Sequence, residues 1–155
     1  MKTLILLLSA CFEVANCAAQ TAQVSPLPPA GRAIYFDADK MAESFKKGEP
    51  LFLTSEYKVI TGRREKPGEV EIHTYDTDFF YIVEGTATFV VGGKAIDTRQ
   101  VAPGEIRGKS IEGGEAFHLK KGDVILVPNG TPHQYLESSS PFLYFIVKST
   151  SKQAQ

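Results

Sequence analysis

Cysteine is scarce in this sequence, tryptophan is absent, and histidine occurs only three times in 155 residues. Both cysteines, Cys11 and Cys17, lie near the start of the chain. A domain that begins after Ala19 therefore has no thiol, which excludes a disulfide framework and thiol catalysis. Because histidine is so rare, each histidine that falls within a recognisable motif is a candidate for chemistry.

An excess of charge of either sign is also missing. The chain carries 17 Lys and Arg against 18 Asp and Glu, for a formal net charge of -1. Without a basic stripe, nothing predicts binding to nucleic acid or to an anionic membrane surface. Hydrophobic residues make up 43% and charged residues 23%, as in an ordinary globular protein of one domain.

Long hydrophobic runs are limited to the N-terminus, where Leu4–Leu8 follows Lys2. A bilayer span needs about 20 apolar residues, so this run is too short to cross a membrane. A positive residue, a short apolar stretch and small residues at Cys17 and Ala19 are typical of a signal peptide over residues 1–19. We therefore expect an exported protein, periplasmic or secreted, whose mature chain has no transmembrane span.

Two other interpretations of this segment stay open. The run from Leu8 to Cys11 resembles a lipobox, with Cys11 as the lipidated residue, although the stretch before it is short for a lipoprotein signal. A buried N-terminal strand or helix fits less well, because three prolines between 26 and 29 separate the segment from the rest of the chain. Residues 20–33 are polar and rich in proline, which predicts a flexible linker before a domain over 34–150.

A short amphipathic helix is predicted over residues 38–47. Asp37 is a suitable N-cap, and Gly48 ends the segment. Met41 and Phe45 lie four residues apart and share one face, which is expected to pack against the outside of the domain.

After the helix the pattern changes to short segments rich in β-branched and aromatic residues. The predicted strands are 51–54, 57–62, 70–73, 79–83, 86–91, 116–119, 124–127, 134–137 and 142–148. Gly92-Gly93 and Gly113-Gly114 mark turns, and the polar stretch 97–110 predicts a loop. Many short strands separated by glycine and proline turns predict an all-β sandwich or barrel.

One segment in the C-terminal part of the chain carries a specific resemblance. From Gly122 the sequence reads five residues, Pro128, one residue, Gly130, two residues and His133. This spacing resembles the second conserved motif of the cupin superfamily at every fixed position through the histidine. The asparagine that ends the family motif is missing, because Glu137 stands at that place.

A second segment, further upstream, resembles the first cupin motif, in which two histidines one residue apart precede a glutamate and a glycine. Glu71 stands at the first histidine and His73 at the second. Asp78 replaces the glutamate, and Gly85 closes the motif. The resemblance covers residues 50–148. It implies the cupin fold, an all-β double-stranded β-helix, here preceded by one short helix.

Cupins commonly bind a divalent metal through three histidines and one glutamate, and the resemblance implies a site of four residues: Glu71, His73, Asp78 and His133. Residues two apart on a strand point to the same face, so Glu71 and His73 can both face the barrel interior. Two imidazoles and two carboxylates suit Fe, Mn, Ni or Zn. Without Glu71, the other three still form a set of two histidines and one carboxylate, like that of non-haem iron sites.

A cupin barrel without metal is the alternative. Glu71 could then lie at the surface, Asp78 could cap a turn, and His133 could serve only to orient its corner of the barrel. Against this, two of the three histidines fall at ligand positions of the motifs. The third, His118, matches neither motif and is interpreted as a packing or surface residue.

Three aromatic residues are predicted to line a substrate pocket beside the metal: Tyr75, Phe80 and Tyr135. Each lies two residues from a predicted ligand and so shares its face of the strand. An apolar wall around polar groups suits a small organic ligand, although ordinary barrel core is the alternative for each residue and the better interpretation for Phe80.

The resemblance leaves three functions open. The first is a metal-dependent enzyme on a small organic molecule, of the oxygenase, isomerase or decarboxylase type. The second is a barrel that binds a small ligand, or shields a metal, without turnover. The third is a structural protein with a dead site, for which the family suggests a homodimer. Fold alone does not choose among them.

Overall fold

The computed structural model describes residues 25, 26 and 28–151. The predicted signal peptide, residues 1–19, lies outside the described residues, and so does the first part of the predicted linker. No helix within this described part of the chain is long and apolar enough to span a membrane.

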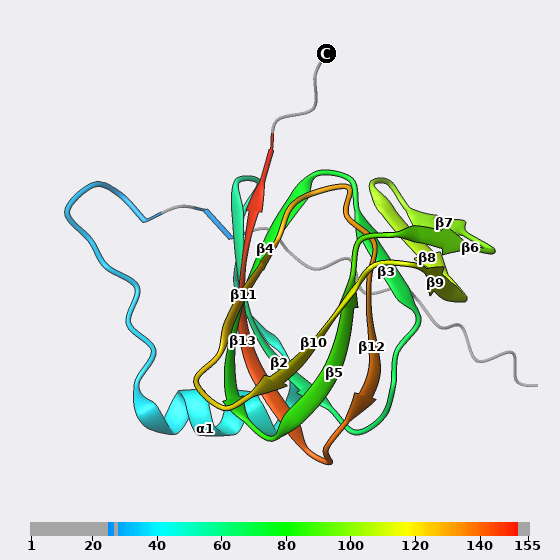
Figure 1. The fold of residues 1–155 in the computed structure, drawn as a ribbon. Coiled ribbons are helices and arrows are strands. Elements are labelled where there is room, and N and C mark those ends of the chain that lie inside the picture. The colour runs from blue at the N-terminus through cyan, green and yellow to red at the C-terminus, as the bar shows by residue number, and fades with distance from the viewer. Residues whose placement is uncertain (1–24, 27, 152–155) are drawn as a thin grey trace, which may run out of the picture.

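Two antiparallel sheets face each other and enclose a barrel (Figure 1). The first sheet has five strands, in the order β1 (Pro50–Leu53), β2 (Tyr57–Arg64), β13 (Phe142–Thr150), β4 (Asp76–Glu84) and β11 (Val124–Val127). The second has six, in the order β10 (Glu115–Lys120), β5 (Thr86–Val91), β12 (His133–Ser138), β3 (Val70–His73), β8 (Glu105–Gly108) and β7 (Arg99–Ala102). A small separate pair is formed by β6 (Lys94–Ile96) and β9 (Ser110–Glu112). The prediction of an all-β double-stranded β-helix is confirmed.

The predicted helix is confirmed as α1 (Ala38–Lys47) on the outside of the barrel (Figure 1). Asp37 caps its first turn, because the side-chain Oδ1 accepts a hydrogen bond of 2.7 Å from the backbone N–H of Lys40. Gly48 ends the helix in the left-handed region, at φ 68°, where glycine has no Cβ to clash.

The contact of α1 with the barrel is more polar than its sequence indicates. Met41 and Phe45 are only half-buried, whereas Ser44 between them is completely buried. The Ser44 hydroxyl lies 2.7 Å from the hydroxyl of Thr61 on β2, so each satisfies the other in the interface. A buried pair of hydroxyl groups therefore fixes the helix on the sheet.

The prediction of a loop over residues 97–110 is wrong. The structure has a hairpin there, β7 and β8, which turns at Gly104 with φ 76°. Strand β8 then pairs with β3, and this pairing places Glu105 opposite His73. Strand β7 is the edge of the sheet and is exposed along its length, and its successive polar residues Arg99 and Gln100 break the alternation of apolar and polar residues that indicates a strand.

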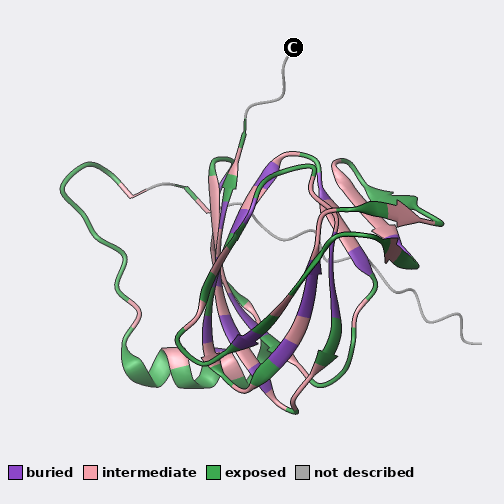
Figure 2. Ribbon diagram, viewed as in Figure 1, coloured by how far each residue is buried: buried purple, intermediate pink, exposed green. Residues whose placement is uncertain are grey.

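The core fills the space between the sheets. Inward-facing side chains of β4, β5, β12 and β13 dominate one continuous cluster. Its members are Phe80, Ile82, Ala87, Phe89, Leu119, Val127, Tyr135, Phe142, Tyr144 and Ile146. Figure 2 shows the buried residues along the barrel strands, while α1 and β7 are largely exposed. The predicted site residues lie on the same inward face and are supported by this core.

A glycine in β2 makes room for one of these aromatic rings, and its replacement should destabilise the barrel. A Cβ on Gly62 would lie 2.1 Å from Cε2 of Tyr144 on the neighbouring strand β13. We expect Gly62→Ala to lower the free energy of unfolding by about 1–3 kcal/mol, as overpacking does. Urea denaturation measures the loss. In a Tyr144→Leu background the added methyl has space, so an equal cost of Gly62→Ala there would contradict this explanation.

Candidate metal centre

Three of the four predicted ligands meet inside the barrel. Glu71, His73 and His133 each place one ligand atom within 4.8 Å of those of the other two. Strands β3 and β12 are neighbours, and their pairing sets Glu71 opposite His133. Alternation along β3 then brings His73 to the same inward face as Glu71. The cluster thus combines residues from two segments that are far apart in the sequence.

Both imidazoles have their Nδ1 atoms bonded to groups that can only accept a hydrogen bond. His73 Nδ1 lies 2.7 Å from the Glu105 carboxylate, and His133 Nδ1 lies 3.0 Å from the backbone carbonyl oxygen of Thr131. Each Nδ1 therefore carries a proton and donates it, so that in the neutral imidazole the lone pair on Nε2 is the one available to a metal. A partner on the far nitrogen is the usual support of a metal-binding histidine.

The charge states of these groups agree with the assignment. Burial alone would raise the pKa of Glu105, but the hydrogen bond from His73 and the nearby cations outweigh it and hold that pKa below its ordinary value. Glu105 is therefore ionised at neutral pH and accepts the bond. Burial lowers the pKa of His133, which is only 3% exposed, so its imidazole is neutral at pH 7. A neutral imidazole is the form that binds metal.

The fourth predicted ligand, Asp78, lies beside the cluster on β4 of the facing sheet. Its Oδ2 is 3.5 Å from Nε2 of His73 and accepts a hydrogen bond of 2.9 Å from Nζ of Lys148. Its other oxygen, Oδ1, is buried and has no hydrogen-bond partner among the described residues. Asp78 is thus neutralised by a lysine on one oxygen and unsatisfied on the other.

These features fit a divalent cation. Two bare imidazole nitrogens and a carboxylate oxygen form the donor set that Fe, Mn, Ni and Zn prefer. The unsatisfied oxygen of Asp78 adds an acceptor that a cation or its water would satisfy. The residues present therefore suit a metal, with Glu71, His73 and His133 as the three that are close enough to share it.

Two arginines flank the outer side of the cluster. Arg64 at the end of β2 donates from Nη2 to Oε1 of Glu71 at 3.1 Å. Arg107 on β8 lies 3.7 Å from Oε2 of Glu71 and donates from Nη1 to Glu105 at 3.3 Å. The glutamate that stands at a usual histidine position is thus held between two guanidinium groups.

Sequence reasoning missed these supporting residues. Glu105 and Arg107 fall in the stretch predicted as a loop, and Arg64 lies two residues beyond the predicted end of its strand. Lys148 could have been found, since alternation along β13 from the buried Phe142 places it on the inward face.

The three predicted pocket residues lie in two different environments. Phe80 and Tyr135 are buried in the aromatic core, and the ring centroid of Phe80 is 6.4 Å from that of His133. Tyr75 is half-buried between β3 and β4, where it lines a cavity of about 80 Å³ together with Glu105. Contact of these three residues with a substrate stays a prediction.

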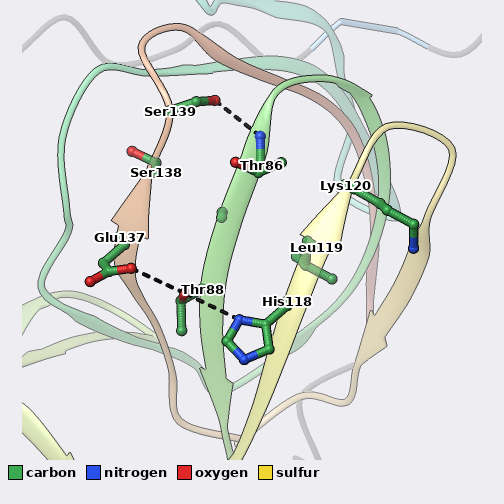
Figure 3. Close-up of a pocket in the computed structure, with 9 residues that line it drawn as sticks. Thr86, Thr88, His118, Leu119, Lys120, Glu137, Ser138 and Ser139 are labelled. Carbon is green, nitrogen blue, oxygen red and sulfur yellow. Dashed lines mark hydrogen bonds between the residues drawn. The ribbon is translucent and has the colours of Figure 1, made fainter.

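The third histidine lies outside the barrel. His118 is exposed on β10, and its Nδ1 is 3.4 Å from the Thr88 hydroxyl in a surface groove of about 470 Å³ (Figure 3). Glu137, which stands where the cupin motif has asparagine, points into the same groove and accepts from Thr88 at 3.4 Å. A register shift in β12 between Tyr135 and Glu137 turns this carboxylate away from the barrel.

No protein-family model matches the sequence, and no curated protein matches it. Solved structures do match the fold. The protein BH2720 of Bacillus halodurans aligns with a TM-score of 0.55 and 15% identity, over 82% of this chain and 88% of that chain. An uncharacterized conserved protein with a double-stranded β-helix domain from Klebsiella pneumoniae aligns with a TM-score of 0.52 and 19% identity, over 78% of this chain and 93% of that chain. This chain therefore has the double-stranded β-helix fold of the cupins, with a cluster of one glutamate and two histidines inside its barrel.

Proposed function

We propose that this protein binds Fe(II), Mn(II), Ni(II) or Zn(II) inside the barrel through Glu71, His73 and His133, and uses the ion to act on a small organic molecule. The observation that carries the proposal is the pair of oriented imidazoles. Both Nδ1 atoms donate to acceptors, at 2.7 Å and 3.0 Å, so both Nε2 atoms are free to bind a metal.

The number of ligands favours chemistry over a purely structural ion. A structural zinc site is closed by four protein ligands, whereas three ligands leave positions for water and substrate. Asp78 is held by Lys148 rather than gathered into the cluster, which keeps the set at three. A bound ion would act as a Lewis acid on a ligand oxygen. Asp78 Oδ1, which has no partner in the described part of the chain, would be the carboxylate oxygen available to accept a proton from that ligand.

Nitrogen-15 NMR of the three imidazoles tests the proposal directly. With Zn²⁺ added to the full chain, we expect the Nε2 resonances of His73 and His133 to shift while each Nδ1 stays protonated. The His118 resonances serve as an internal control and should not move, because that ring lies on the outer surface. A spectrum in which Zn²⁺ leaves all three rings unchanged, or moves only His118, would overturn the proposal.

Removing the carboxylate behind His73 should weaken metal binding. We expect Glu105→Ala to lower the affinity for Zn²⁺ by about 10–100-fold, the usual effect of losing the partner that orients a ligating histidine. Competition with a chromophoric chelator measures the affinity. Glu69→Ala is the matched control, since Glu69 pairs with Arg99 on the exposed surface. Equal affinities in the two variants would show that Glu105 does not support the site.

A further inference from the structure

The barrel site balances its charges without any bound ion. Three carboxylates each form an ion pair with a cation of their own. The pairs are Glu71 with Arg64 at 3.1 Å, Asp78 with Lys148 at 2.9 Å, and Glu105 with Arg107 at 3.3 Å. Both histidines of the cluster are buried and have acceptors on Nδ1. The six side chains of these three pairs therefore contribute no net charge between them.

A divalent ion added to such a site brings a charge of 2+ that no further carboxylate of these pairs offsets. Uncompensated charge is costly in a buried, low-dielectric environment, so a ligand that carries negative charge is favoured over a neutral one of the same shape. The two guanidinium groups beside Glu71 add to this preference, because arginine matches the geometry of a carboxylate.

Hydrogen-bond donors beside the cluster lack partners. Arg64 Nε is buried and bonds to nothing among the described residues, and the same is true of the Tyr135 hydroxyl. The Arg64 guanidinium lies over the Tyr135 ring, with Cζ 4.4 Å from its centroid. The Arg64 guanidinium also lies against Gly68, where an added Cβ would be 2.5 Å from Nη1. The two unsatisfied donors thus belong to side chains that stack on one another, and buried donors in native proteins are normally satisfied.

We propose that the small molecule bound at this site is an organic carboxylate, received by Arg64 and by the Tyr135 hydroxyl next to the metal. This inference rests on the proposed metal site and names its ligand class. In this proposal the carboxylate reaches the site from the side on which the two arginines lie. There the side chains of Arg64, Glu71, Arg107 and Glu105 are 19–29% exposed, whereas His73 and His133 are only 6% and 3% exposed.

Matched pairs of acids and amides test the ligand class. The full chain is loaded with Zn²⁺, its metal content is measured, and it is titrated calorimetrically with acetate, pyruvate and malonate and with their uncharged amides. We expect each carboxylate to bind at least about 10-fold more tightly than its amide, the scale of a hydrogen bond to a charged group. The Arg64 Nε–H signal in a proton–nitrogen NMR spectrum should shift with the acid and not with the amide.

Variants locate the subsite. We expect Arg64→Gln and Tyr135→Phe each to weaken carboxylate binding about 10-fold or more. The controls are Arg63→Gln, whose parent residue pairs with Glu65, and Tyr81→Phe at an exposed position, and both should leave binding unchanged. Tyr135→Phe keeps the aromatic core, so it reports on the hydroxyl even if Arg64→Gln fails to fold.

The outcomes separate this inference from the proposed function. Amides that bind as tightly as acids, or equal affinities in Arg64→Gln and Arg63→Gln, overturn the carboxylate subsite while the metal content stands. Failure to load Zn²⁺ refutes the metal proposal instead. The same four variants then test the subsite on the metal-free protein, where a loss of acetate binding specific to Arg64→Gln and Tyr135→Phe supports it and its absence refutes it.

Discussion

Replacing Lys148 with methionine is expected to lower the free energy of unfolding by about 3–5 kcal/mol, the cost of leaving a buried charge without its partner. Lys148 and Asp78 are 8% and 1% exposed, and their contact of 2.9 Å is a direct cross-strand pair between β13 and β4. Methionine keeps most of the side-chain volume, so the loss reports on the charge and not on a cavity. Denaturation in guanidinium chloride, with and without metal, measures it.

A surface pair of the same chemistry provides the control. Lys120 pairs with Asp123 at 3.2 Å, but its side chain is 72% exposed and water screens the interaction. Lys120→Met should therefore leave stability unchanged. We also expect Zn²⁺ to stabilise Lys148→Met more than the unmodified protein, because a bound cation offsets the charge of Asp78. A Lys148→Met protein as stable as Lys120→Met would show that the buried charge of Asp78 does not depend on Lys148.

Replacing either histidine of the cluster with alanine is expected to abolish metal binding. His73→Ala and His133→Ala each remove one of three ligands, so the loss of affinity should exceed the about 10–100-fold expected for a residue that only orients a ligand. Competition with a chromophoric chelator measures each variant. His118→Ala is a strict control, because it removes the one remaining histidine, which lies on the outer face of the barrel.

The pattern of results across these variants distinguishes the possible ligand sets. Loss of affinity in His73→Ala and His133→Ala, with none in His118→Ala, agrees with the cluster described above. The metal affinity of Asp78→Asn shows whether the fourth predicted ligand, which lies beside the cluster and is paired with Lys148, also binds the ion. Loss of metal binding in His118→Ala, with no loss in His73→Ala or His133→Ala, would show that the metal binds in the surface groove.

Much of the fold follows from local patterns in the sequence. The cap at Asp37 and the αL residue at Gly48 mark both ends of α1. Short strands between glycine turns indicate the all-β class. The spacing of Glu71 and His73 places them on one face of β3 by alternation alone, and the motif that ends at His133 supplies the third member of the cluster.

The rest depends on contacts between distant segments, which no local pattern contains. Strand β8 pairs with both β3 and β7, and only its pairing with β3 relates Glu105 to His73. Asp78 was predicted as a ligand, but its main partner, Lys148, comes from a strand 70 residues away. Contact of a substrate with Tyr75, Phe80 and Tyr135 stays a prediction, as do export and a homodimer.

Elemental mass spectrometry shows directly whether the barrel binds a divalent metal. The protein is purified without a histidine tag or chelator, then equilibrated separately with Fe(II), Mn(II), Ni(II) and Zn(II) and freed of unbound ion. We expect near-stoichiometric retention of at least one of these ions. Retention of none of them, by a protein that remains folded, would contradict the proposed metal site.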